Sequence, residues 1–395
     1  MSVQRLEEAY AAPAWLDGIQ RRALRVGSAG VVLSVIGAFA SPEQFFRSYL
    51  VGFLFWVGIP LGCLGLSMLQ HMTGGAWGLV ARRIFEAASR TLPLLAVLFV
   101  PILFGTRELY VWARPEAVAG NELLQHKQPY LNEGFFIGRS LFYFLVWSFF
   151  AVLLDRWSLQ QDRTGDPGLH RRMQIWSALG LVAYTLTASF AAFDWLMSLD
   201  PFWFSSIYGF HFIVGQVVAA FCFHILVSRR LMMSEPMSRV FAARHFDDYG
   251  KLLLCFVLLW VYMTFSQYLV IWSGNLPEEI TWYLHRRGGG YRWWGVLVLA
   301  LHFGLPFFLL MSRALRRNPK ALALLAVPVL LSHGLDVYWQ AVPSIRPDGL
   351  ALHWLDLVVP IGIGGVWIAA FVRELKKRAL LPIHDPRLEE AIGDA

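Results

Sequence analysis

Residues 44–69 read QFFRSYLVGFLFWVGIPLGCLGLSML, and this stretch decides the class of the protein. The 22 residues that follow Arg47 within it carry no charge. A helix of that length covers about 30 Å, which is the thickness of the hydrocarbon core of a bilayer. Apolar runs of this kind recur along the whole chain. The sequence therefore predicts an all-α polytopic membrane protein.

The composition of the whole chain agrees with this class. Of the 395 residues, 57% are hydrophobic and 15% are charged, and the mean hydropathy is +0.50. A soluble protein would carry about a quarter of charged residues. The net charge of +7 does not indicate a nucleic-acid partner here, because basic residues collect in the cytoplasmic loops of membrane proteins.

The apolar runs predict ten membrane spans. They lie at 24–40, 44–69, 90–112, 134–154, 173–193, 205–227, 250–272, 293–311, 320–340 and 352–372. We expect residues 1–23 and 373–395 to be a cytoplasmic N-terminal segment and C-terminal tail around a membrane domain of residues 24–372. The termini and the loops after even-numbered spans hold 25 of the 34 Lys and Arg residues. This excess predicts that both termini face the cytoplasm and that odd-numbered loops face the periplasm of a bacterium.

Two connections on the predicted outer side resemble one another. After span 3, Trp112 is followed by Pro and Glu, and the chain then reaches His126–Lys127. After span 7, Trp272 is again followed by Pro and Glu, and the chain reaches His285–Arg286. The offset of four spans is even, which predicts two parallel-related four-helix bundles, spans 2–5 and 6–9, with spans 1 and 10 peripheral. A chance similarity between two outer loops is the alternative.

Two His-x-x-Asp motifs lie in residues 331–360, LSHGLDVYWQAVPSIRPDGLALHWLDLVVP. They pair His333 with Asp336 and His353 with Asp356, each on one helical face in the outer half of the membrane. Ionisable groups at membrane depth are costly and mark functional candidates. Three interpretations stay open: hydrogen bonds that tie helices 9 and 10 together, a proton relay or quinol contact, and a metal site.

Other ionisable groups are predicted at similar depth. Asp194 and His211 lie at the junction of spans 5 and 6, and Glu133 and Arg139 lie on span 4. The separation of His211 from His224 also resembles that of axial haem ligands, but no second helix supplies a matching pair. No catalytic residue or metal ligand is assigned. The candidates for a quinol contact or proton path are His333, Asp336, His353, Asp356, Asp194, His211, Glu133 and Arg139.

Two local predictions concern the connections. Asp200 is followed by Pro201, which fits a helix N-cap with proline at the first helical position. The run ARRIFEAASR, residues 81–90, is predicted to be an amphipathic interfacial segment with its arginines at the lipid headgroups.

Four long stretches carry a resemblance to a known family. Together they resemble the ActF subunit of bacterial alternative complex III, and the similarity extends over about residues 44–372. ActF-like chains belong with the membrane subunits of the NrfD and polysulfide-reductase PsrC type. The stretches are QHMTGGAWGLVARRIFEAASRTLPLL (70–95), YLNEGFFIGRSLFYFLVW (130–147), FDWLMSLDPFWFSSIYGFHF (193–212) and FSQYLVIWSGNLPEEITWY (265–283).

The resemblance implies a fold and a set of partners. It implies ten spans around two four-helix bundles in the bacterial inner membrane. It also implies a complex that oxidises membrane quinol, either menaquinol or ubiquinol. Electrons then pass through iron–sulfur and c-type haem partner subunits to cytochrome c or a terminal oxidase. An ActC-like membrane partner is expected to hold the main quinol site beside the iron–sulfur subunit.

The resemblance further implies that this chain holds no metal centre of its own. Cys63, Cys222 and Cys255 each stand alone, and the sequence has no CxxC or CxxCH motif. It therefore does not predict an iron–sulfur cluster or a c-type haem held by this chain alone. A second quinol site, a proton path and a purely architectural role all stay open for an ActF-like chain. A secondary transporter is the alternative from another functional class.

Overall fold

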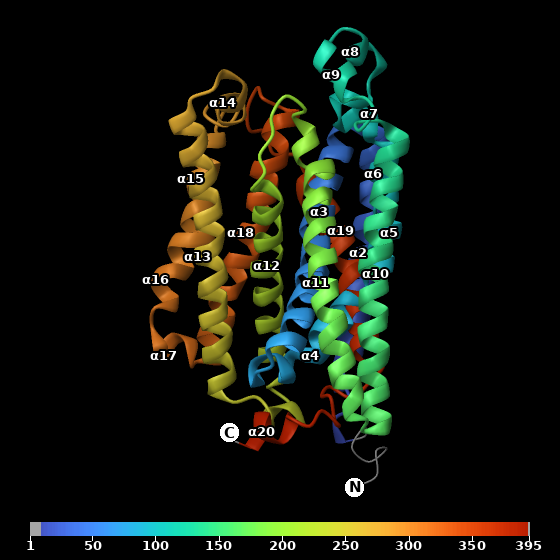
Figure 1. Cartoon of the computed structure of the whole chain (residues 1–395), viewed down its shortest axis with the longest axis vertical. Coiled ribbons are helices and arrows are strands. Elements are labelled where there is room, and N and C mark those ends of the chain that lie inside the picture. The colour runs from blue at the N-terminus through green and yellow to red at the C-terminus, as the bar shows by residue number, and fades with distance from the viewer. Residues whose placement is uncertain (1–8, 394–395) are drawn as a thin grey trace.

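Figure 1 shows the computed structural model of the chain, which describes residues 9–393. These residues form helices and connecting segments, with no strand among them. Ten helical segments of the described chain are long and apolar enough to cross a membrane, which confirms the all-α polytopic fold. Both termini lie at the same end of the molecule (Figure 1), which we call the terminal end. The opposite end, which carries α14 (Pro277–Leu284), is the distal end.

Each of the ten predicted spans overlaps one helical segment of the structure. These segments are α2 (Trp15–Ala40), α3 (Pro42–Thr73), α4 (Ala76–Ser89) with α5 (Leu92–Leu98) and α6 (Val100–Phe104), α10 (Glu133–Thr164), α11 (Pro167–Trp195) with η2 (Met197–Leu199), α12 (Tyr208–Leu231), α13 (Ala243–Gly274), α15 (Tyr291–Val298) with η4 (Leu299–Gly304) and α16 (Leu305–Leu310), α18 (Pro319–Ile345), and α19 (Leu355–Leu375). The connections contain α7 (Thr106–Leu109), η1 (Val111–Ala113), α8 (Pro115–Ala119), α9 (Glu122–Lys127), η3 (Met237–Arg239), α17 (Arg313–Arg316) and α20 (Leu388–Gly393).

The third span differs from its predicted position. It was predicted over residues 90–112, but its first helix begins at Ala76 and its last ends at Phe104. Pro93 and Pro101 follow the breaks between α4, α5 and α6, where a proline cannot donate the next helical hydrogen bond. The span is therefore a chain of short helices that starts nearer the terminal end.

Local sequence signals explain how consecutive spans reverse direction. After α10, Gly165 has a φ of +64°, a conformation that glycine adopts without strain. Asp166 then accepts a hydrogen bond from the Gly168 backbone N–H at 2.8 Å, and Pro167 occupies the first helical position of α11. The chain thus turns back within a few residues, and α10 and α11 form an antiparallel hairpin.

The spans pack in two groups of four helices. The first bundle contains α3, α4–α6, α10 and α11, and the second bundle contains α12, α13, α15–α16 and α18. In Figure 1 the second bundle lies on the left, and α3 of the first packs against α12 of the second where the bundles meet. These groups correspond to the predicted spans 2–5 and 6–9, while the parallel relation between the two halves stays a prediction.

The first and last spans lie outside the two bundles and pack on each other. A Cβ atom on Gly30 of α2 would lie 2.6 Å from the Cα atom of Gly362 on α19. Only glycine allows two backbones to approach so closely, as in other glycine-rich contacts between membrane helices. The opposite face of α2 exposes Val32 and Ile36. The small residues of span 1 therefore mark its contact with α19.

Candidate functional site

A cavity of about 730 Å³ lies at the distal end of the second bundle. Helices α12, α13, α14, α15 and α18 supply its walls, and most of its large side chains are aromatic. A partly open site of this size and lining is typical of those that take small, mainly apolar ligands. The aromatic residues that line it are Tyr208, Trp260, Tyr268, Trp272, Trp282, Tyr283 and Trp339.

The rim of the cavity lies on membrane-spanning helices. Tyr268 and Trp272 on α13, and Val296 on α15, line the cavity and also expose much of their side chains on the outer surface. A bilayer would cover such an apolar surface. The cavity therefore has exposed apolar residues at its rim, on helices long enough to cross a membrane.

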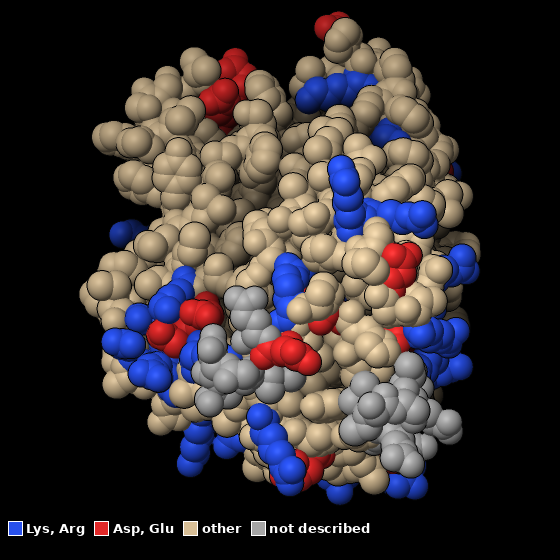
Figure 2. Space-filling view, turned by 60° about the horizontal axis from the view of Figure 1, so that its bottom comes forward, with Lys and Arg blue, Asp and Glu red and all other residues tan. Residues whose placement is uncertain are grey.

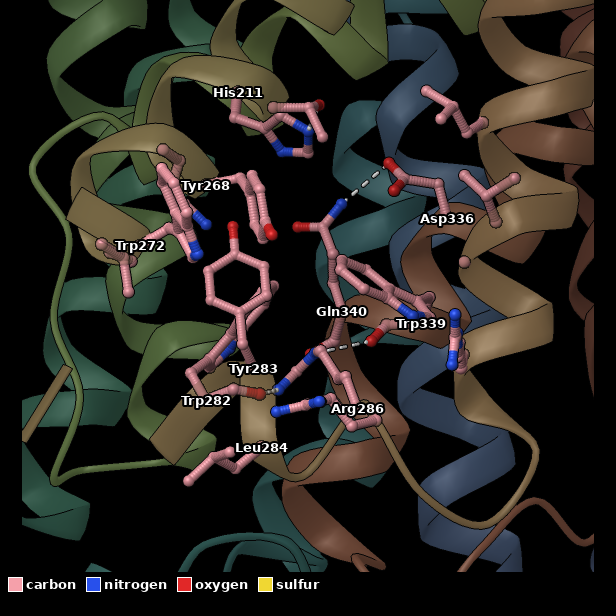
Figure 3. A pocket seen from close by; sticks show the side chains of 18 of the residues that line it. His211, Tyr268, Trp272, Trp282, Tyr283, Leu284, Arg286, Asp336, Trp339 and Gln340 are labelled. Atoms are coloured by element: carbon pink, nitrogen blue, oxygen red, sulfur yellow. Dashed lines mark hydrogen bonds between the residues drawn. The ribbon is translucent and has the colours of Figure 1, made fainter. Parts of the chain in front are cut away.

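The deep end of the cavity contains a carboxylate without a cationic partner. Asp336 on α18 is 3% exposed. Its Oδ2 atom accepts a hydrogen bond from Gln340 Nε2 at 2.8 Å and a longer one from Trp260 Nε1 at 3.4 Å. No Lys or Arg of the described chain forms an ion pair with it. Figure 3 shows Asp336 and Gln340 on the same wall, where an i, i+4 spacing places them one turn apart.

His211 on α12 faces the same space (Figure 3). Its Nε2 atom lies 3.0 Å from Thr264 Oγ1, and the Thr264 hydroxyl donates to the Trp260 carbonyl at 2.9 Å. Because that hydroxyl proton is already used, Thr264 Oγ1 accepts from His211, and a neutral imidazole carries its proton on Nε2. Nδ1 is then an acceptor, and no described residue donates to it.

A buried arginine closes the outer part of the cavity. Arg286 donates to the carbonyl oxygens of Trp282 and Gln340, both at 2.7 Å, and of Trp339 at 3.2 Å. The Trp339 carbonyl is free for this contact because Pro343, one turn later, has no N–H. Burial lowers the pKa of Arg286 to about 9, so the guanidinium stays charged at neutral pH.

A π-helical turn, η4, borders the cavity on the α15 side. Pro306 follows it and cannot donate to the carbonyl of His302 one turn earlier, which favours a widened turn. His302 is buried, with Nδ1 2.9 Å from Ser332 Oγ and its ring centroid 4.4 Å from that of Trp260. The turn holds the α15 wall against α18 and the cavity residue Trp260.

The structure separates the first predicted pair. His333 lies on α18 with Asp336 but points toward α3 and α12, where Cβ atoms on Gly58 and Gly215 would lie 3.2 and 3.3 Å from its ring. Neither ring nitrogen has a hydrogen-bond partner among the described residues. The interpretation of this pair as a local hydrogen bond is therefore excluded, and of the two residues Asp336 lines the cavity and His333 does not.

The second predicted pair is local and structural. Asp356 accepts the His353 backbone N–H at 2.9 Å, as a side chain does at the start of a helix. Its other oxygen accepts from Ser48 Oγ at 2.6 Å and Gln44 Nε2 at 3.0 Å, both on α3. The contact therefore joins α19 to α3 rather than to α18. Neither His353 nor Asp356 lines the cavity.

Two other candidates neutralise each other in the first bundle. Arg139 on α10 binds Asp194 on α11 through two nitrogens, each 2.8 Å from a carboxylate oxygen. Tyr143 donates a third hydrogen bond to Asp194 at 2.7 Å, and Asp194 is fully buried. The guanidinium also stacks 3.8 Å above the Tyr130 ring. The pair closes the distal end of the first bundle.

Glu133 and Asp200 have roles near the distal surface. Glu133 lies 3.3 Å from Arg107 Nε and 3.2 Å from Thr106 Oγ1, and its side chain is 41% exposed. Asp200 follows η2, whereas α12 begins only at Tyr208, so the N-cap prediction is wrong. The reason is that the chain after Asp200 forms a turn before the helix starts.

A buried ion cluster at the terminal end was not predicted. Arg82 lies 2.8 Å from Asp385, and Arg83 pairs with Glu86 at 2.5 Å and also with Asp162. Both arginines are essentially unexposed, so their predicted place at lipid headgroups is wrong. Helix α4 is enclosed by α3, α10, α12 and the C-terminal segment, which turns these arginines inward.

The C-terminal segment supplies part of this cluster. Arg378 pairs with Asp155 of α10, and the Leu380 backbone N–H donates to the Tyr10 carbonyl at 2.8 Å. Burial alone would raise the pKa of Asp385, but the nearby Arg82 and Arg387 outweigh burial and lower it to about 2. Asp155 and Asp162 lie in the polar run that follows predicted span 4, so no sequence signal distinguishes them from residues of an exposed loop.

Comparison with known proteins adds no assignment. A scan against models of protein families and a search of curated proteins both find no match for this chain. Among residues 9–393, no three His, Cys, Asp or Glu side chains are grouped so that they could hold a metal ion. The cavity that contains His211 and Asp336 is the candidate functional site of the described chain.

Proposed function

We propose that this chain is a quinol-binding membrane subunit of a quinol-oxidising respiratory complex, of the alternative complex III type that its sequence resembles. The observation that carries the proposal is the aromatic cavity with His211 and Asp336 at its deep end. A quinol is a flat ring with two hydroxyl groups and a lipid-soluble tail. Aromatic walls suit the ring, the lipid-side rim suits the tail, and the two titratable groups suit the hydroxyls.

The proposed chemistry divides between this chain and its partners. Oxidation of one quinol to quinone releases two protons and two electrons. In this proposal His211 Nδ1 and Asp336 accept the protons, since both are placed at the cavity and have free acceptor capacity. The two electrons pass to an iron–sulfur or c-type haem centre of a partner subunit.

We also propose that the distal end faces the periplasm of a bacterial inner membrane. Lys and Arg side chains gather around the terminal end, as Figure 2 shows. Basic residues are retained on the cytoplasmic side of membrane proteins, which supports this orientation. Protons from the cavity would then leave on the periplasmic side.

The architectural alternative has support at the other candidate residues. Arg139 with Asp194, and Asp356 with Ser48, form contacts between helices and do not line the cavity. We therefore assign these groups to stability and restrict the quinol site to the second bundle.

The test uses a tagged chain purified from its native membranes with whatever accompanies it. We expect iron–sulfur and c-type haem subunits in the preparation, visible in a reduced-minus-oxidised spectrum. In that complex, His211→Phe should slow quinol oxidation at least about tenfold, the value of one hydrogen bond to a buried group. Glu133→Gln is the matched control and should leave the rate unchanged.

Two results would overturn the proposal. If His211→Phe assembles normally and oxidises quinol at the normal rate, the cavity is not the quinol site. If the chain purifies alone and catalyses substrate-dependent flux in vesicles, the transporter alternative replaces it.

A further inference from the structure

We infer that the cavity selects the reduced form of its ligand, a hydroquinone, over the corresponding quinone. The reason is that its deep end presents hydrogen-bond acceptors whose orientation is set by residues that do not themselves need to touch the ligand. The inference rests on the proposed function, since it concerns the same site.

The orientation of Gln340 is set by Asp336. An ionised carboxylate can only accept hydrogen bonds, so the Gln340 nitrogen must be the atom that lies 2.8 Å from Asp336 Oδ2. The amide oxygen then points the other way. Figure 3 shows it directed away from Asp336, and Oε1 is buried without a partner among the described residues. Gln340 thus holds Asp336 Oδ2 in place, while its own Oε1 atom is enclosed and not open to the cavity.

His211 is oriented in the same manner by Thr264. The Thr264 hydroxyl is used by the Trp260 carbonyl, so Thr264 accepts from His211 Nε2 and leaves Nδ1 unprotonated. Thr264 is one turn beyond Trp260 on α13, whereas His211 is on α12. Thr264 is therefore a positioning residue that acts through the tautomer of His211.

Asp336 supplies the second acceptor. Both of its donors, Gln340 and Trp260, bind Oδ2, and no described residue donates to Oδ1. The hydroxyl groups of Tyr268 and Tyr283 also line the cavity, but a phenol can donate or accept and does not discriminate. The groups that discriminate at the deep end are His211 Nδ1 and Asp336 Oδ1.

At the deep end of the cavity, these two acceptors match only the reduced form of a quinone. A hydroquinone offers two O–H donors, whereas a quinone offers two carbonyl acceptors and no donor. A site built to accept hydrogen bonds leaves its own groups and the ligand unpaired when the donor is missing, and this costs affinity. Preference for the reduced form would also promote release of the quinone after oxidation.

The experiment measures binding of both forms to the full chain in nanodiscs by equilibrium dialysis without oxygen. The probes are decyl-ubiquinol, kept reduced with ascorbate, and decyl-ubiquinone, each quantified by chromatography. We expect the hydroquinone to bind at least about tenfold more tightly, which corresponds to one hydrogen bond. Equal binding, or tighter binding of the quinone, would overturn the inference and leave the proposed site intact. Binding of neither form would instead count against the proposed function.

Two substitutions test the polarity directly. In Asp336→Asn, Gln340 Nε2 would hold the Asn oxygen, so that the new amide N–H₂ faces the cavity as a donor. The preference should then fall about tenfold or reverse. Thr264→Val removes the acceptor that sets the His211 tautomer and should reduce the preference by a smaller factor, with the fold intact.

The matched control is His224→Phe. His224 is a buried histidine on the same helix as His211, but it packs against Phe85 and Tyr249 and does not line the cavity. The ratio of the two affinities should not change. If it changes as much as in Asp336→Asn, or if Asp336→Asn and Thr264→Val both leave it unaltered, the two acceptors are not the cause of the selectivity.

Discussion

The distal ends of the two bundles each contain a buried aspartate, and the two are held differently. Asp194 in the first bundle is bound by Arg139 at 2.8 Å through both oxygens and by Tyr143 at 2.7 Å. Among residues 9–393, Asp336 in the second bundle accepts hydrogen bonds only from the neutral donors Gln340 and Trp260. A buried carboxylate that is paired with a cation forms a structural contact. Without a cation, the carboxylate stays free to bind a proton or a ligand.

The surroundings of the two carboxylates differ in the same sense. Around Asp194 the aromatic side chains pack on each other, with the Trp195 ring 4.9 Å from Phe99 and 5.7 Å from Phe144 between centroids. Around Asp336 the aromatic side chains line a cavity of about 730 Å³. The first bundle is closed by packing and charge, whereas the second keeps space beside its carboxylate.

The sharpest test of this comparison is the same substitution at both sites. Asp194→Asn removes the counter-charge of the buried Arg139 and should lower the free energy of unfolding by about 3–5 kcal/mol. Asp336→Asn removes a carboxylate that has no cation and should change it by less than about 1 kcal/mol. Thermal unfolding of the detergent-solubilised chain measures both. Equal losses at the two sites would mean that Asp336 also has a structural partner.

The buried ion cluster at the terminal end predicts that the stability of the fold depends on pH. The pKa of Asp385 in the folded chain is about 2, below its ordinary value of 3.8. A depressed pKa stabilises the folded state above pH 3.8, and this contribution, roughly 2 kcal/mol, is lost as the pH falls toward 2. The free energy of unfolding of the wild-type chain should therefore fall more steeply between pH 4 and pH 2 than that of the Asp385→Asn variant. Parallel pH profiles would show that Asp385 is not held by Arg82.

A smaller effect is expected for the residue that orients His211. Thr264→Val keeps the shape of the side chain but leaves His211 Nε2 without its acceptor, so the free energy of unfolding should fall by about 1 kcal/mol. Nuclear magnetic resonance of the chain labelled at histidine nitrogens would report the loss of the Nε2–H tautomer. An unchanged tautomer would indicate that another group orients the ring.

The smallest effect is expected at Glu133. Its side chain is 41% exposed and its contact with Arg107 is 3.3 Å long. Exposed ion pairs contribute little, so Glu133→Gln should change the free energy of unfolding by less than about 0.5 kcal/mol. A loss comparable to that of Asp194→Asn would place Glu133 in the structural closure of the first bundle.

Sequence alone determined the class of the protein and most of its architecture. Ten apolar runs such as residues 44–69 predict ten spans, and the division into two bundles followed from the offset between the connections after Trp112 and Trp272. These features were predictable because hydropathy is a local property that can be summed along one helix. The position of span 3 was not predictable in this way, because Pro93 and Pro101 divide the span into short helices.

Which polar side chains contact one another depends on the tertiary structure and could not be predicted from the sequence. Arg139 and Asp194 pair across 55 residues, and His211 is oriented by Thr264, 53 residues away on another helix. His333 and Asp336 share a helix but face different neighbours. The physical reason is that successive residues turn by about 100° around a helix, so the partner of a side chain depends on how that helix is rotated and packed against the others.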